Sequence, residues 1–150
     1  MNMKRMKKAL SCILCIVLIV AMALCTTACN GNTKKQAAQE NGVAVMTNGA
    51  VLGEGGNQFT FTVVDKDGNE VTGEIHTDET MVGEALMKLG VIEGEEGQYG
   101  LYVKRVNGIL ADFDVDGTYW AFYINGEYAM TGVDVTEITA GSSYAFKVEK

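Results

Sequence analysis

Acidic side chains that could bind a cation stand at every second position from Asp112 to Asp116, and Gly117 follows them. Asp112, Asp114, Asp116 and Gly117 match the first, third, fifth and sixth positions of a calcium-binding loop. The twelfth position of such a loop needs a Glu that binds the ion with both oxygens, but Tyr123 stands there. The pattern therefore favours a solvated connection over a calcium loop.

A calcium ion would need a further ligand from outside this stretch. Glu127 and Asp134 follow it in the chain, and either carboxylate could fold back to complete the site. Nothing in the sequence indicates that folding, so we expect no bound calcium and no resident cofactor.

Aromatic side chains fill the next stretch, Tyr119–Ile124. If this stretch is a strand, Trp120 and Phe122 face one way, and Tyr119 and Tyr123 face the other. We expect Trp120 to fill the core, while the tyrosines either cover neighbouring strands or form a platform for a flat or sugar-like ligand. The candidate ligand-binding residues are Tyr102, Tyr119, Tyr123, Tyr128 and Met130.

Residues for catalysis are scarce. After the amino-terminal region the chain holds one histidine, His76, and two serines, Ser142 and Ser143. The serines follow a glycine in a turn and do not stand in the strand–turn–helix setting of a nucleophile elbow. Carboxylate pairs for glycoside cleavage stay open because the region holds many acids. We predict no catalytic residues and no enzymatic activity.

The elements that would position these side chains can be read from hydrophobic spacing. Alternation predicts strands over residues 59–63, 71–75, 101–106, 119–124 and 144–148, and apolar residues predict a helix over 82–89. Residues 77–80 are its N-cap candidates, and Gly90 is placed to end it. Two Asn-Gly pairs, at 107–108 and 125–126, suit tight turns. The order predicts an α+β fold, a β-grasp-like mixed sheet of about five strands with one packed helix.

The amino-terminal region has the marks of a secretory signal peptide. Four positive charges lie between Lys4 and Lys8, and a mostly apolar run follows from Ala9 to Leu24. Small residues then precede Cys29, a pattern that resembles the lipobox of bacterial lipoproteins. The competing Cys25 follows Leu24, which is too large for that position. We predict a signal peptide over 1–28, a lipid on Cys29 and attachment to the bacterial cell membrane, facing away from the cytoplasm.

Charge and composition divide the rest of the chain. All 19 acidic residues but only eight of the 12 basic ones follow Cys29, so the processed chain carries a net charge of about −11. Clustered bases, which nucleic-acid binding requires, are missing, so we expect no nucleic-acid partner. Residues 29–56 are mostly polar and small and predict a flexible linker, although the apolar part from Val43 to Leu52 could pair at a sheet edge. Residues 57–150 form the predicted domain.

Several motifs of this domain together resemble the transcobalamin-like C-terminal domain family, a largely uncharacterised family of bacterial surface lipoproteins. The motifs are TMVGEAL (80–86), YGLYV (99–103), VNG (106–108), YWAFYINGEYA (119–129) and GVD (132–134). The resemblance covers the whole predicted domain. It implies the fold, and it implies cobalamin or another corrinoid as a candidate ligand.

Two functions are consistent with these observations. The first is a cell-surface lipoprotein whose non-catalytic module binds a small molecule such as a corrinoid. The alternative is a structural or accessory envelope lipoprotein that acts through protein–protein contact.

Overall fold

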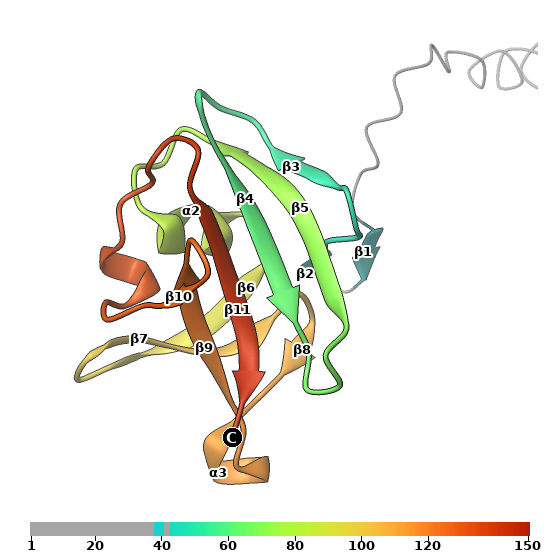
Figure 1. The fold of residues 1–150 in the computed structure, drawn as a ribbon, viewed down its shortest axis with the longest axis vertical. Helices are drawn as coiled ribbons and strands as arrows, with labels where there is room; N and C mark the ends of the chain where they lie inside the picture. The colour runs from blue at the N-terminus through green and yellow to red at the C-terminus, as the bar shows by residue number, and fades with distance from the viewer. Residues whose placement is uncertain (1–37, 41–42) are drawn as a thin grey trace, which may run out of the picture. The chain divides into compact units, whose positions relative to one another are not determined.

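The computed structural model describes residues 38–40 and 43–150 (Figure 1). The predicted signal peptide and Cys29 lie outside these residues, so the signal peptide and the lipid stay predictions. Within the described part, no helix has the length and apolar character that a membrane crossing requires.

The larger of two layers is a six-stranded sheet in the order β10-β9-β11-β4-β5-β3. Its strands are β3 (Val51–Gly53), β4 (Asn57–Val64), β5 (Glu70–Thr77), β9 (Tyr119–Ile124), β10 (Glu127–Tyr128) and β11 (Ser143–Glu149). β11 runs parallel to β4, and β3 runs parallel to β5, whereas the other neighbours are antiparallel. The last strand of the chain thus lies in the middle of the sheet, between β4 and β9 (Figure 1).

The second layer consists of a short helix and a smaller sheet. The helix is α2 (Val82–Lys88), and the three-stranded sheet has the order β6-β7-β8. Its strands are β6 (Ile92–Gly97), β7 (Gly100–Val106) and β8 (Ile109–Leu110). The remaining elements are the pair β1 (Ala38–Glu40) and β2 (Val43–Val45), the four-residue helix α3 (Phe113–Asp116) and the 3-10 turn η1 (Val133–Val135).

The predicted fold class is wrong, because the protein is mostly β. It has two larger sheets of six and three strands where the sequence predicted one sheet of about five, and α2 contains only seven residues. Strand β6 was not predicted because its residues IEGEEG lack apolar alternation. Strands β8 and β10 have two residues each and are too short to show any alternation. The strands predicted at 101–106 and 119–124, which correspond to β7 and β9, belong to different sheets.

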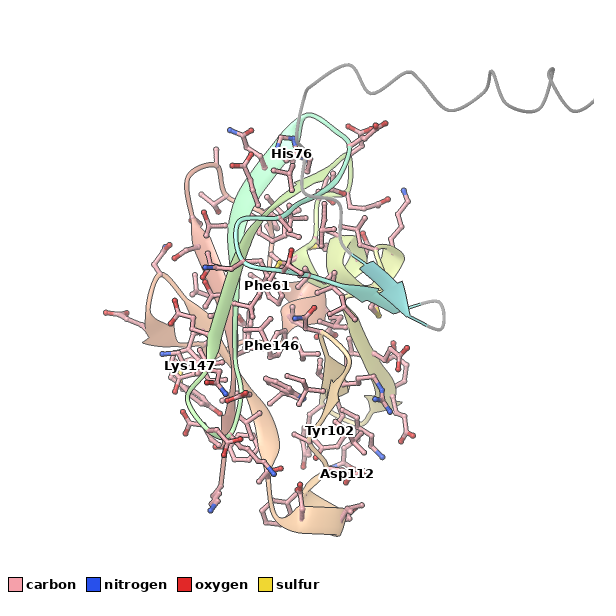
Figure 2. All side chains as sticks on the ribbon, turned by 90° about the vertical axis from the view of Figure 1, so that its right-hand side faces the viewer. Phe61, His76, Tyr102, Asp112, Phe146 and Lys147 are labelled. Carbon is pink, nitrogen blue, oxygen red and sulfur yellow. The ribbon has the colours of Figure 1, made fainter. Side chains whose placement is uncertain are left out.

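The core lies between the two layers and is rich in aromatic rings. Phe61 and Phe146 stand on neighbouring strands with their ring centroids 6.2 Å apart, and Trp120 meets Phe146 edge-on. Figure 2 shows Phe61 and Phe146 pointing inward from the larger sheet. The prediction that Trp120 fills the core is confirmed, since only 6% of it is exposed.

The segment before β3 belongs to this core, although residues 29–56 were predicted to be a flexible linker. Met46 and Ala50 are fully buried, and β3 pairs with β5 at the sheet edge. The buried Asn107 holds the segment in place, because its amide donates to the Met46 carbonyl at 3.0 Å and its side-chain oxygen accepts from the Met46 N–H. Asn107 was predicted only to form a turn, which it does with a positive φ of 50°.

The predicted end of helix α2 is confirmed, but its predicted start is not. Gly90 ends the helix in a left-handed conformation, as predicted. At the other end the N-cap is Met81, without a side-chain cap, and the Val82 N–H donates to the Thr136 carbonyl. The turn η1 packs so closely on the helix that a Cβ at Gly83 would come within 2.9 Å of the Asp134 Cα. Tertiary contact thus replaces the predicted N-cap.

Candidate ligand-binding face

The outer face of the six-stranded sheet carries three tyrosines, Tyr119, Tyr123 and Tyr128, which we call the tyrosine face. Strand alternation turns Tyr119 and Tyr123 away from the core, because Trp120 and Phe122 point inward. The pairing of β9 with β10 places Tyr128 beside Tyr123, with ring centroids 5.6 Å apart and planes at 79°. Tyr128 is 54% exposed, so the cluster can be reached from solvent.

Two charged side chains of β11 complete this face. The ammonium group of Lys147 lies over the ring of Tyr123, 4.5 Å from its centroid. The hydroxyl of Tyr123 donates a hydrogen bond to the carboxylate of Glu149. In Figure 2, Lys147 lies on the opposite side of the sheet from Phe146, its neighbour in the chain.

The phenol groups of Tyr119 and Tyr123 keep their protons well above neutral pH. The hydrogen bond to Glu149, aided by partial burial, raises the pKa of Tyr123 to about 12. Partial burial also raises the pKa of Tyr119, and the nearby Tyr128 and Glu149 add to that rise. The hydroxyls of these two tyrosines therefore remain hydrogen-bond donors at physiological pH.

Small side chains form the sheet surface next to the tyrosines. Ala145 pairs in register with Tyr123 on one side and with Thr62 on the other. The hydroxyls of Thr62 and Thr72 lie 2.9 Å apart and continue the row toward β5. Because Ala145, Thr62 and Thr72 have short side chains, the sheet surface beside the Tyr123 ring is low, and a flat molecule could lie on it. A shallow hollow at one end of the face is lined by Gln58, Phe59, Thr60, Glu74, Gly141 and Ser142.

Of the five predicted ligand-binding residues, Tyr102 lies apart from the tyrosine face, and Met130 has an exposed side chain. Tyr102 is on β7 in the other layer, where its ring lies 5.8 Å from the Lys104 ammonium (Figure 2). Met130 follows the end of β10 and is 94% exposed, so few contacts position its side chain. The structure therefore brings Tyr119, Tyr123 and Tyr128 together, while the binding role of all five residues stays a prediction.

The acidic stretch forms the short helix α3 and the turns around it. Asp112 is the N-cap and accepts from the Asp114 N–H at 3.1 Å, while its other oxygen lies 3.3 Å from the Lys104 ammonium. Asp116 accepts from the N–H and the hydroxyl of Thr118. Their carboxylates are thus used in local hydrogen bonds. Among residues 38–40 and 43–150 no three His, Cys, Asp or Glu side chains are grouped to hold a metal ion.

The residues weighed for catalysis lie on β5 and in the turn before β11. His76 lies on the outer side of β5, where its ring contacts the carboxylate of Glu74. Ser142 lies at the turn before β11, and its hydroxyl accepts from the Asn125 amide at 3.5 Å. The expectation that the protein has no enzymatic activity stays a prediction.

Sequence reasoning missed Lys147 and Glu149. Alternation along residues 144–148 already places Lys147 on the polar side of its strand. What was missing is the pairing of β11 with β9, which joins residues more than twenty positions apart and puts Lys147 opposite Ala121, between Tyr119 and Tyr123.

Comparisons with known proteins give a family match for part of the chain. Residues 78–150 match the model described as a domain of unknown function, DUF4430, in agreement with the expectation of an uncharacterised domain. No curated protein matches this chain.

Two solved structures are among those that match this chain. One is a protein from Ruminococcus gnavus with the provisional name "metal binding protein", which is 29% identical with a TM-score of 0.60. That match covers 63% of this chain and 98% of the other. The second is haptocorrin in complex with Cbi, which is 17% identical with a TM-score of 0.45. This match covers 63% of this chain but only 25% of haptocorrin.

Proposed function

We propose that this protein is a non-catalytic binding module, held at the outer side of a bacterial membrane by a lipid on Cys29, that binds a small molecule with its tyrosine face. The observation that carries the proposal is the convergence of Tyr119, Tyr123 and Tyr128 on the sheet face opposite the core. Buried aromatics are explained by packing, but these three rings add nothing to the core.

The chemistry of this face suits a flat or sugar-like ligand. Aromatic rings offer apolar area, and their hydroxyls add directional hydrogen bonds without much loss of side-chain freedom. Small side chains next to Tyr123 leave room for a ring to lie against the sheet. The motif resemblance to transcobalamin-like domains makes a corrinoid the first ligand to test.

The proposal is tested by titrating the protein with cobalamin, cobinamide and a set of monosaccharides, followed by calorimetry and absorbance. We expect replacement of both Tyr123 and Tyr128 by alanine to weaken binding by at least about tenfold, the effect of roughly 1.4 kcal/mol. Tyr99→Ala is the matched control, because Tyr99 is 93% exposed and lies outside the tyrosine face. If cobalamin does not bind at about 100 μM, a level that corresponds to weak affinity, a corrinoid is not the ligand.

The alternative function, contact with another envelope protein, is favoured by a different surface. Leu110, Phe113 and Val115, on β8 and α3, are 51%, 60% and 75% exposed. Exposed apolar side chains that gather in one place often mark a protein interface. A photo-crosslinking residue at position 113 in intact cells should then capture one partner, whereas the same residue at position 99 should not.

A further inference from the structure

Lys147 is a half-buried base without an acidic partner, unlike the half-buried Lys104 and Arg105. Lys88, Lys104 and Arg105 each pair with a carboxylate, at 2.6 Å from Glu79, 3.2 Å from Glu95 and 3.2 Å from Glu93. Within the part of the chain that the structure describes, no carboxylate oxygen lies within 4.0 Å of the Lys147 ammonium.

The acid that could neutralise Lys147 is engaged elsewhere. Glu149 lies two positions along β11 and therefore on the same face of the sheet. Its carboxylate accepts the hydrogen bond from the Tyr123 hydroxyl. Tyr123 thus holds both groups, because its hydroxyl occupies Glu149 while its ring lies under the Lys147 ammonium.

This arrangement positions a positive charge at the edge of the low surface described above. A ring contact stabilises an ammonium group but leaves its hydrogen-bond donors unused on the side away from the ring. Lys147 pairs in register with Ala121 and Val64, and the neighbouring row contains Ala145 and Thr62. These side chains are short, so a ligand on the sheet can approach the ammonium.

We propose that Lys147 selects ligands that carry a carboxylate on a sugar or aromatic ring. The inference rests on the proposed function, since it assigns a ligand class to the same tyrosine face. The ring of the ligand lies on Ala145 and Thr62 beside Tyr123, and its carboxylate accepts a charge-assisted hydrogen bond from Lys147. A single ammonium matches the single charge of a carboxylate, whereas a phosphate dianion would bring a second negative charge to an already acidic protein.

The test compares ligands that differ only in charge. The full chain, solubilised in mild detergent, is titrated with glucuronate against glucose and with benzoate against benzyl alcohol, and binding is followed by saturation-transfer NMR. We expect each acid to bind about tenfold more tightly than its neutral analogue at low salt, a typical effect of one charge-assisted hydrogen bond. Added salt should reduce this preference because it screens the charge.

Three substitutions assign the preference to Lys147. Lys147→Met keeps an apolar chain against the Tyr123 ring and should abolish the preference, whereas Lys147→Arg should keep it. Lys66→Met is the matched control, since Lys66 lies in the exposed turn between β4 and β5 and should leave the preference unchanged. Circular dichroism of each variant checks that the fold is intact.

The outcomes separate this inference from the proposed function. Neutral and acidic probes that bind equally, with binding lost in Tyr123→Ala, would overturn the role of Lys147 and leave the tyrosine face as a binding site. A preference that survives in Lys147→Met would also overturn it. If no probe binds, the inference fails, while the titration with cobalamin and cobinamide still tests the proposed function. If the probes bind and Tyr123→Ala leaves their binding unchanged, both the inference and the proposed function fail.

Discussion

The two faces of the six-stranded sheet use the same residue types for different purposes. On the inner face Phe61, Phe146 and Trp120 are almost completely buried and contact one another through their rings. On the outer face Tyr123 and Tyr128 meet at a similar distance, yet they stay accessible and their contacts include charged groups. An aromatic pair is therefore a packing unit on one face and a candidate binding surface on the other.

The difference shows that position relative to the core decides what an aromatic residue contributes. Phe146 and Lys147 are neighbours in β11, joined by one peptide bond, yet one lies in the core and the other on the outer face. Substitutions on the inner face should mainly change stability, and substitutions on the outer face should mainly change binding and titration.

The largest effect is expected from Phe61→Ala on the inner face. Phe61 is fully buried, so its truncation removes apolar contacts and leaves a cavity, which costs about 3–5 kcal/mol of unfolding free energy. The neighbouring Thr60→Ala on the outer face should change stability by less than about 0.5 kcal/mol. Urea denaturation measures both. Equal losses at the two positions would contradict the assignment of the faces.

A smaller loss is expected when the inner face is made larger at Gly73. A Cβ there would lie 2.8 Å from the Ala50 carbonyl oxygen, which is fixed by a hydrogen bond from the Glu74 N–H. We expect Gly73→Ala to cost about 1–3 kcal/mol, as overpacking does in other cores. Gly56→Ala is the control, because open space surrounds that position. Thermal unfolding of the two variants compares them directly, and a neutral Gly73→Ala would show that the amino-terminal segment packs loosely.

On the outer face, Glu149→Gln should change titration more than stability. Loss of the carboxylate removes the main cause of the raised pKa of Tyr123, so that pKa should fall from about 12 toward its ordinary value of 10.0. Phenolate absorbance during an alkaline titration measures the change, with Tyr123→Phe identifying the signal. An unchanged titration would mean that the hydrogen bond to Glu149 is absent in solution.

The same hydrogen bond predicts how stability depends on pH. The folded chain binds the Tyr123 proton more tightly than the unfolded chain, in which the pKa is near 10.0. This phenol therefore favours the folded state below pH 10, and its contribution is lost as the pH rises from 10 to about 12. Wild type should lose more stability than Tyr123→Phe across that range, as judged by urea midpoints. Identical slopes would contradict the raised pKa.

Much of the local structure follows from the sequence. Alternation placed strands at the positions of β4, β5, β7, β9 and β11, and the helix and its end at Gly90 were also predicted. The candidate site was predicted only in part. Tyr119 and Tyr123 follow from alternation within one strand, but Tyr102 was grouped with them by nearness in sequence and lies in the other layer.

The two Asn-Gly pairs show why the rest could not be predicted. Asn107 and Asn125 have the same local sequence and nearly the same φ, 50° and 51°. One is buried and holds Met46, whereas the other accepts from the Ser143 N–H at an exposed hairpin. Their side chains differ in partner because the partners come from distant parts of the chain.

The sequence by itself determined five of the strands, at the positions of β4, β5, β7, β9 and β11, and which side of each is apolar, because both depend on residues two positions apart. Tertiary structure alone decided that these strands divide between two sheets, that Met46 enters the core, and that Tyr123 contacts both Lys147 and Glu149. Those outcomes depend on which strands pair, and pairing is set by contacts between residues far apart in the chain.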